Sequence, residues 1–310
     1  MADIQEIIAS IPEAASEGCA NWGAPFPLAM EGCKVLVLGS GAGRDAFIAG
    51  KLVGSCGQVI GVEFNADLVA KANEIKEEIG ANNVTFMQGC HMTLDGLNIK
   101  SDSIDLVIAN GALSHAPNTQ TQLNTIWRVL NYGGELYACD IFTDRRTPDE
   151  VKTDAVKALG LAGALYIEDF RRKMTLAGWE DFRHMETSAY KGEKPAEVEE
   201  FTYFVRTVRA YKIPDKIEDL CEQYYQSATY KGGIEGSEDW YDLDDHHRFI
   251  KDVPLSVCGN SCAMVEDTRV SKFFEIEGNR EKHGGPYPGC GNIPYSVDGE
   301  SEDSGCGCCC

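Results

Sequence analysis

The sequence lacks a long apolar run and has few basic residues. The longest apolar run near its start, KVLVLG from Lys34, is far shorter than the roughly 20 residues that span a membrane. The start, MADIQEIIAS, has no basic segment before an apolar stretch, so we expect no secretion signal and a cytoplasmic location. With 28 basic and 49 acidic residues, the chain carries a net charge of −21, which repels nucleic acid and anionic membranes. We therefore expect neither partner, while the oligomeric state stays open.

Cysteine, in contrast, is abundant. Thirteen cysteines are present, and without a secretion signal, free thiols, thiolate ligands or redox pairs explain them better than structural disulfides. Four of them crowd the end of the chain, where they form a candidate site for soft metal or metalloid ions. The alternative is a disordered thiol tail open to oxidation. The four are Cys306, Cys308, Cys309 and Cys310.

The order of apolar patterns predicts an α/β fold. Apolar runs predict strands at 34–38, 58–64, 84–87, 104–109 and 135–142, and helical patterns lie between them at 44–53, 67–79 and 119–130. This alternation predicts a parallel, doubly wound sheet. After a helix at 167–178, strand patterns at 181–190 and 201–211 flank the polar loop KGEKPAEVEE and predict an antiparallel edge hairpin. Five parallel strands followed by such a pair resemble the seven-stranded, Rossmann-like sheet of class I methyltransferases.

The patterns weaken after Ile213, where we predict only a short helix over 216–225. From Gly278 the chain is rich in Gly, Pro, Ser and Asn, which is typical of a flexible tail. We therefore predict four parts: an N-terminal segment (1–33), a cofactor-binding domain (34–212), a small C-terminal domain (213–277) and a Gly/Pro/Cys-rich tail (278–310).

A glycine loop follows the first predicted strand and opens a helix. In LGSGAGRD, from Leu38 to Asp45, the glycines allow a sharp turn and a close approach of backbone N–H groups to a ligand. The helix N-terminus beyond the loop favours an anionic group, such as the carboxylate of S-adenosylmethionine (SAM) or the pyrophosphate of NAD. Glu63 ends the second strand, where its carboxylate can accept both hydroxyls of an adenosine ribose.

Several features favour SAM over NAD. The loop from Gly89 to Met92 follows the third strand, where methyltransferases place adenine, and Asn110 lies at the carboxyl end of the fourth strand. The predicted edge hairpin also favours SAM, because it is typical of a methyltransferase sheet. Val37 stands where an acidic residue often precedes the loop, and Asp45 is a candidate for its role. The predicted SAM contacts are Gly39, Ser40, Gly41, Gly43, Glu63, Phe64, Cys90, His91, Asn110 and Gly111.

From Gly18 to Gly285 the sequence resembles the arsenite methyltransferase family. The matching stretches include APFPLAMEGCKVLVLGSGAGRDAF, RVLNYGGELYACDIF, AGALYIEDFRRKM, ATYKGGI, DLDDHHRF and CGNSCAMVEDTR. The resemblance implies the class I fold, SAM as methyl donor and a soft acceptor. In the family, cysteines hold trivalent arsenic near the SAM methyl group, and the arsenic lone pair attacks the methyl carbon.

The chain departs from the family at several of those cysteines. At three positions where the family has a cysteine, this chain has another residue: Trp22, Ala46 and Gly160. Arg206 lies near a fourth such position. Cys221, Cys258 and Cys262 remain in family-like surroundings, outside the Rossmann-like region. The aromatic residues near these positions are candidates for a pocket that attracts a cationic amine or a sulfonium, with core packing as the alternative. The predicted pocket residues are Trp22, Phe26, Gly160, Tyr166 and Arg206.

One histidine is a candidate for catalysis. His115 follows the fourth strand at the active-site edge, where it can act as a general base or only bond to backbone. Three functions stay open: a methyltransferase acting on trivalent arsenic, another metalloid or a thiol; one acting on an amine or other small organic molecule; and a non-catalytic protein that binds SAM or a metalloid. Methyl transfer from labelled SAM distinguishes the three.

Overall fold

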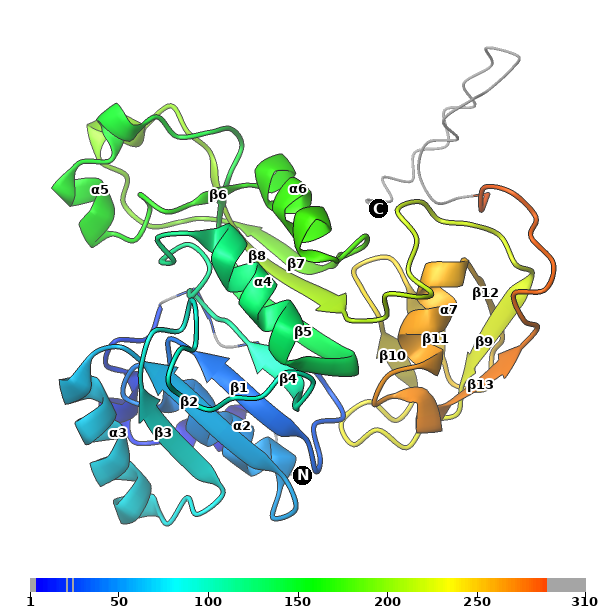
Figure 1. Ribbon diagram of the computed structural model, residues 1–310, viewed down its shortest axis with the longest axis horizontal. Coiled ribbons are helices and arrows are strands. Elements are labelled where there is room, and N and C mark those ends of the chain that lie inside the picture. Colours follow the sequence, from blue (N-terminus) through cyan, green and yellow to red (C-terminus); the bar gives the residue numbers. More distant parts are fainter. Residues whose placement is uncertain (1–3, 21, 24, 289–310) are drawn as a thin grey trace.

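A computed structural model describes residues 4–20, 22–23 and 25–288 of the chain. The strands of its main sheet are β1 Lys34–Leu38, β2 Gln58–Glu63, β3 Val84–Gln88, β4 Ile104–Ile108, β5 Leu130–Thr143, β6 Leu165–Tyr166, β7 Arg183–Ala189 and β8 Tyr203–Tyr211. They follow the order β3-β2-β1-β4-β5-β8-β7, with β6 beside the end of β5 (Figure 1). The first five are parallel, and β8 and β7 are antiparallel. The predicted seven-stranded sheet and its edge hairpin are confirmed.

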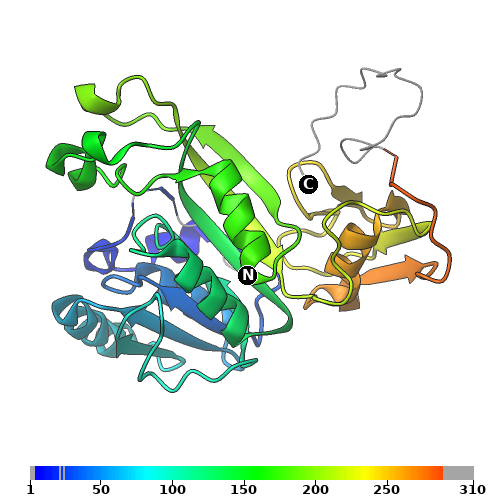
Figure 2. The same ribbon diagram turned by 45° about the horizontal axis from the view of Figure 1, so that its top comes forward.

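Helices cover both faces of the sheet (Figure 2). The helices α1 Ile4–Ala9, α2 Arg44–Val53 and α3 Ala66–Ile79 pack on one face, and α4 Thr119–Val129 and α6 Ile167–Ala177 pack on the other. Capping residues define the ends of α3. At its start, Asn65 Oδ1 accepts a hydrogen bond from Asp67 N at 2.9 Å, and at its end Gly80 adopts the left-handed conformation. Shorter helical turns are η1 Glu13–Ser16, η2 Asp149–Val151, α5 Asp154–Ala158 and η3 Ala196–Val198.

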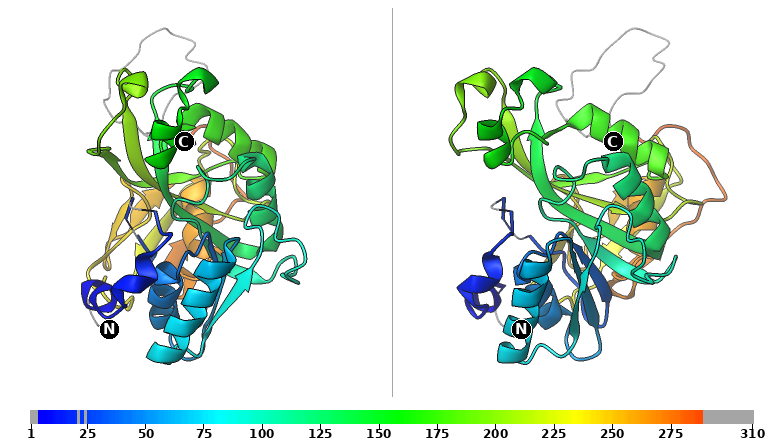
Figure 3. Two further views of the ribbon diagram at one scale, coloured as in Figure 1. Left: turned by 90° about the vertical axis from the view of Figure 1, so that its left-hand side faces the viewer. Right: turned by 60° about the vertical axis from the view of Figure 1, so that its left-hand side comes forward.

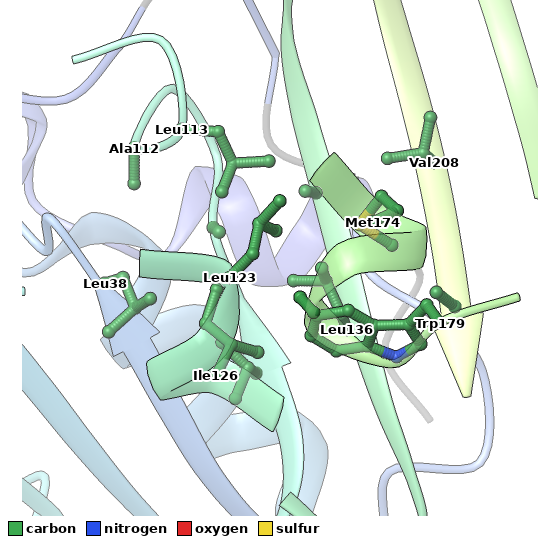
Figure 4. Packing of buried hydrophobic residues seen from close by; sticks show 14 of the residues in the cluster. Leu38, Ala112, Leu113, Leu123, Ile126, Leu136, Met174, Trp179 and Val208 are labelled. Carbon is green, nitrogen blue, oxygen red and sulfur yellow. The ribbon is translucent and has the colours of Figure 1, made fainter. Parts of the chain in front are cut away.

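A buried cluster between the sheet and α4 and α6 supports the carboxyl end of β4. Leu38, Leu123, Leu136 and Trp179 belong to it, and so does Leu113 from the loop after β4 (Figure 4). Burying each such side chain contributes about 1.5–3 kcal/mol. The loop after β4 is therefore anchored in the core before it reaches the surface.

Residues after β8 form a smaller domain beside the amino end of β5 (Figures 1 and 3). It contains a three-stranded sheet of order β12-β9-β13 and a hairpin of β10 and β11, packed around α7. Asp244 closes the hairpin, because its Oδ1 accepts from His246 N and His247 N. Its elements are β9 Gln226–Tyr230, β10 Trp240–Asp242, β11 Arg248–Ile250, β12 Leu255–Val257, α7 Gly259–Glu266, η4 Ser271–Phe273 and β13 Phe274–Glu277.

The short helix predicted over 216–225 is wrong. This segment is a turn followed by irregular chain, because distant residues take up its backbone groups. Glu218 N donates to Asn260 Oδ1 at 2.9 Å, and the Glu222 carbonyl accepts from Gly259 N at 2.9 Å. Residues 284–287 of the predicted tail also bond to this segment, with Tyr287 N donating to the Cys221 carbonyl at 2.8 Å.

Two buried ionic clusters join the smaller domain to the main sheet. Glu135 on β5 pairs with Arg209 on β8 and with Arg269, which follows α7. At the sheet edge, Arg183 pairs with Asp181 at 2.7 Å and with Asp244 at 3.1 Å. In the part of the chain that the structure describes, no helix is both long and apolar enough to cross a membrane.

Candidate active site

The glycine loop between β1 and α2 makes a tight turn into the start of α2, where the donors not used by the loop itself are the Ser40 hydroxyl and the first N–H groups of the helix. Gly39, Gly41 and Gly43 have φ values of 64°, 52° and 105°, in the left-handed region that favours glycine. Gly43 caps α2 without a side-chain hydrogen bond, so the first N–H groups of the helix lack a side-chain acceptor at the cap. Ser40 is buried, and its hydroxyl has no partner among the described residues. This arrangement fits the carboxylate of an amino-acid moiety such as that of SAM.

Glu63 lies beside this loop at the carboxyl end of β2. Its Oε2 accepts from Gly41 N and its Oε1 accepts from Asn65 N, both at 3.0 Å. The next residue, Phe64, leaves 69% of its surface exposed, so its ring is available to a flat group. A carboxylate held at this place fits the two hydroxyls of an adenosine ribose.

The N-terminal segment crosses the glycine loop. Ala42 N donates to the Glu17 carbonyl at 2.8 Å, and a Cβ on Gly41 would meet that oxygen at 2.7 Å. Cys19 follows in the same segment, with Sγ 3.9 Å from the Ser40 carbonyl. Burial, with the nearby charge of Asp45, raises the pKa of Cys19 to about 11, so its thiol is protonated at neutral pH.

The predicted adenine loop presents two different side chains. Cys90 is exposed, whereas His91 is buried and its Nδ1 lies 2.9 Å from Gln122 Nε2 on α4. Burial lowers the pKa of His91, so the ring is neutral at physiological pH. A neutral, fixed ring beside an exposed thiol suits an uncharged purine.

Asn110 joins three elements at the carboxyl end of β4. Its Nδ2 donates to Asp45 Oδ2 at 2.9 Å, and its Oδ1 accepts from Cys139 N at 3.1 Å. Asp45 lies in the first turn of α2, whereas Val37 is buried in the core. Gly111 follows Asn110 in the chain, and its N–H donates a hydrogen bond to the Cys139 carbonyl at 2.8 Å. The glycine loop, β4 and β5 therefore meet at one fixed point.

A buried carboxylate on β5 holds the loop after β4. Asp140 Oδ2 accepts from Leu113 N at 2.9 Å and from Ser114 N at 3.1 Å. Asp140 is fully buried, and burial raises its pKa. Sequence reasoning missed this residue. The available signal was a charged residue inside the apolar strand LYACDIF.

Three residues lie close together beside this loop: His115, Trp22 and Gly160. His115 Nδ1 lies 2.6 Å from the Gly111 carbonyl, which can only accept, so Nδ1 is the donor of this hydrogen bond. A Cβ on Gly160 would lie 3.7 Å from His115 Cε1 and 3.1 Å from Trp22 Cζ2. Cys139, another residue that sequence reasoning missed, lies below with Sγ 3.5 Å from the Trp22 carbonyl. These contacts bring the N-terminal segment, the loop after β4 and the loop after α5 together at one place.

The other predicted pocket residues, Phe26, Tyr166 and Arg206, have the following contacts, and Arg206 lies opposite Asp140 in the pairing of β5 with β8. Phe26 packs in the core beneath α1 and α2. Tyr166 precedes α6, with the Arg146 guanidinium 5.9 Å from its ring centre. Arg206 lies in the middle of β8 and contacts the Phe204 ring and Thr187. The terminal cysteines, Cys306, Cys308, Cys309 and Cys310, lie outside the described residues.

Replacing Asp140 with alanine is expected to reduce methyl transfer about 100-fold while S-adenosylhomocysteine still binds within about threefold of wild type. Without the carboxylate, two buried N–H groups lose their acceptor and the loop after β4 shifts together with any acceptor that lies against it. A displacement of about 1 Å between acceptor and methyl group costs about this much. Asp140→Asn keeps one oxygen acceptor and is expected to retain more activity. Turnover rates, and S-adenosylhomocysteine binding measured by calorimetry, check this prediction on both variants. If Asp140→Ala lost cofactor binding and stability as well as turnover, the role of Asp140 would be merely structural.

The fold and the glycine-loop site define a class of enzyme. A family model described as a methyltransferase domain matches residues 29–191. Together with the sheet order, this establishes a class I methyltransferase that uses SAM as its methyl donor, and an enzyme rather than a non-catalytic binding protein. SAM supplies the methyl group as a sulfonium.

Similarity to known proteins assigns the family. The arsenite methyltransferase of Aquipseudomonas alcaligenes is 36% identical over 289 residues, covering 90% of this chain and 82% of that protein. The human arsenite methyltransferase is 30% identical, covering 90% and 76%. The crystal structure of an arsenic(III) S-adenosylmethionine methyltransferase from Chlamydomonas reinhardtii is 37% identical, with a TM-score of 0.87, covering 92% of this chain and 98% of that chain. The chain belongs to the arsenite methyltransferase family.

Proposed function

We propose that this enzyme methylates trivalent arsenic held at the carboxyl edge of the sheet. The observation that carries the proposal is the likeness to arsenite methyltransferases along nearly the whole chain. Sulfur at the acceptor edge supports it, because Cys139 lies beneath Trp22 and Cys19 lies beside the glycine loop. Trivalent arsenic is soft and prefers such ligands.

The protonated thiols suit this acceptor. Burial raises the pKa of Cys139 to about 12. When a thiol binds an arsenic hydroxide, one As–S bond forms and one As–O bond breaks, and the thiol proton leaves with the hydroxyl as water. The arsenic keeps the lone pair that attacks the methyl group, so the enzyme contributes mainly position. We assign Gly39, Gly41, Gly43 and Glu63 to the cofactor and His115 to the acceptor.

A second acceptor class is an organic amine. The observation that favours it is the aromatic group around Trp22, whose ring meets that of Tyr190 edge to face at 5.7 Å. Tyr190 in turn lies 6.3 Å from Tyr203. Such rings attract a cation, including a methylated ammonium product.

Methyl transfer from labelled SAM to arsenite, selenite, a small thiol and a secondary amine tests the proposal. Methylated arsenic is expected. Methylation restricted to the amine would replace the first acceptor class with the second.

His115→Gln distinguishes the two classes further. With arsenic, the change is expected to alter turnover by no more than about threefold, because the attacking lone pair requires no deprotonation. With an amine, loss of the base is expected to reduce turnover by about 10²–10⁴-fold. Rates with each acceptor check this, with His283→Gln in the smaller domain as the matched control.

A further inference from the structure

The loop after β3 places a buried histidine beside the residues assigned to the cofactor. Gly89 N donates to the Glu63 carbonyl at 2.9 Å, so the loop begins next to the residue whose carboxylate is assigned to the ribose. Two residues further on, His91 leaves only 9% of its surface exposed. The charges of both Glu63 and His115 act on its ring, so the ring lies between the two ends of the site. The base attached to the ribose therefore lies against His91.

Gln122, in the first turn of α4, is the hydrogen-bond partner of this histidine. Its side chain is fully buried, and its Nε2 lies 2.9 Å from His91 Nδ1. An amide nitrogen can only donate, so His91 Nδ1 accepts and carries no proton. Burial lowers the pKa of His91, so the ring is neutral and its single proton is on Nε2. His91 therefore offers one fixed N–H donor.

The oxygen of the same amide is an unused acceptor. Gln122 Oε1 is buried and has no hydrogen-bond partner among the residues that the structure describes. A buried amide oxygen is normally bonded, so a ligand N–H is its natural partner. The two side chains thus combine one donor with one acceptor. Adenine carries the complementary groups next to each other, a 6-amino donor and a ring nitrogen that accepts.

We propose that His91 and Gln122 form an adenine-binding pair, in which His91 Nε2 donates to a ring nitrogen and Gln122 Oε1 accepts from the 6-amino group. The pair makes the cofactor site selective for a 6-aminopurine over a 6-oxopurine. A 6-oxo group brings a second acceptor to Gln122 Oε1 and leaves that buried oxygen unpaired. The inference concerns the cofactor, so it holds whichever acceptor the enzyme methylates.

The selectivity is tested with S-adenosylhomocysteine and S-inosylhomocysteine, which carry a 6-amino and a 6-oxo group. We expect wild type to bind the adenosine compound at least about 100-fold more tightly in calorimetry, because the other compound leaves a buried polar group unpaired. Gln122→Leu removes both amide groups at similar size and should reduce this ratio at least about 10-fold. Asn124→Leu, at an exposed position of the same helix, is the matched control and should keep the wild-type ratio.

A wild-type ratio near one overturns the proposal, and so does an unchanged ratio in Gln122→Leu. Both binding measurements require no methyl acceptor, so their failure leaves the proposed function untouched. Absence of methylated arsenic, with the expected binding ratios, would instead overturn the proposed function alone.

Nitrogen-15 NMR of the histidine rings tests the positioning of His91 by Gln122, because a merely structural role for Gln122 would not fix a tautomer. In wild type at neutral pH we expect His91 as the Nε2–H tautomer, with its signals identified by their loss in His91→Ile. Gln122→Leu should lose this single tautomer. The wild-type spectrum decides the matter even if that variant does not fold, since an Nδ1–H tautomer or a protonated ring there overturns the proposal.

Discussion

Replacement of Glu63 by alanine is expected to weaken S-adenosylhomocysteine binding by at least 100-fold. Hydrogen bonds to a charged group are worth about 1.5–3 kcal/mol each, and two ribose hydroxyls donating to one carboxylate sum to about 3–6 kcal/mol. At about 1.4 kcal/mol per tenfold, this corresponds to about 10²–10⁴ in Kd. Titration calorimetry measures the change.

The same carboxylate also orders the glycine loop through Gly41 N, so the variant needs a check of its fold. Circular dichroism and the melting temperature supply this check. Glu74→Ala removes an exposed carboxylate from α3 and is the matched control, with unchanged affinity expected. If Glu63→Ala folds and binds S-adenosylhomocysteine as tightly as wild type, the assignment of Glu63 to the ribose is wrong.

Replacement of Arg269 by methionine is expected to destabilise the protein by about 1.5–3 kcal/mol, because Glu135 loses one of its two charged hydrogen-bond partners and keeps the other, Arg209. Arg269 also donates to the carbonyls of Leu28 and Ala29, so the link to the N-terminal segment is lost as well. Denaturant unfolding measures the loss. Arg145→Met, which removes an exposed partner of Asp144, is the control and should change stability little.

Acid sensitivity gives this prediction a second measurement. Burial alone would raise the pKa of Glu135, but Arg209 and Arg269 outweigh it and hold the pKa below its usual range. The ionised pair therefore contributes its full stability above the pKa of an unfolded glutamate, about 4.3, and loses it as the pH falls through the folded pKa. Arg269→Met should begin to lose stability at a higher pH than wild type. A double variant, Glu135→Gln with Arg269→Met, should be less stable than Arg269→Met alone, because it leaves the buried Arg209 guanidinium without a carboxylate partner. Equal stability of the two variants would contradict this prediction.

The sequence predicted the main sheet well because its signals are local. The bounds of α2 and β1 match the prediction, since each element carries its own apolar pattern and ends at a glycine loop or a glycine. The smaller domain was harder to predict, because its strands are short and residues 216–225 bond to distant partners. No local pattern distinguishes such a segment from a helix.

By itself, the sequence determined the strand–loop–helix order, the glycine turn and the acidic residue at the end of β2. Each depends on residues close together along the chain, where periodicity and backbone freedom act directly. Only the tertiary structure decided which side chains meet beside the loop after β4 and where the smaller domain contacts the main sheet. Trp22 and Gly160 belong to separate segments, and Asp140 and Arg269 find partners on other elements. Such contacts arise from the packing of whole elements, which no short stretch of sequence specifies.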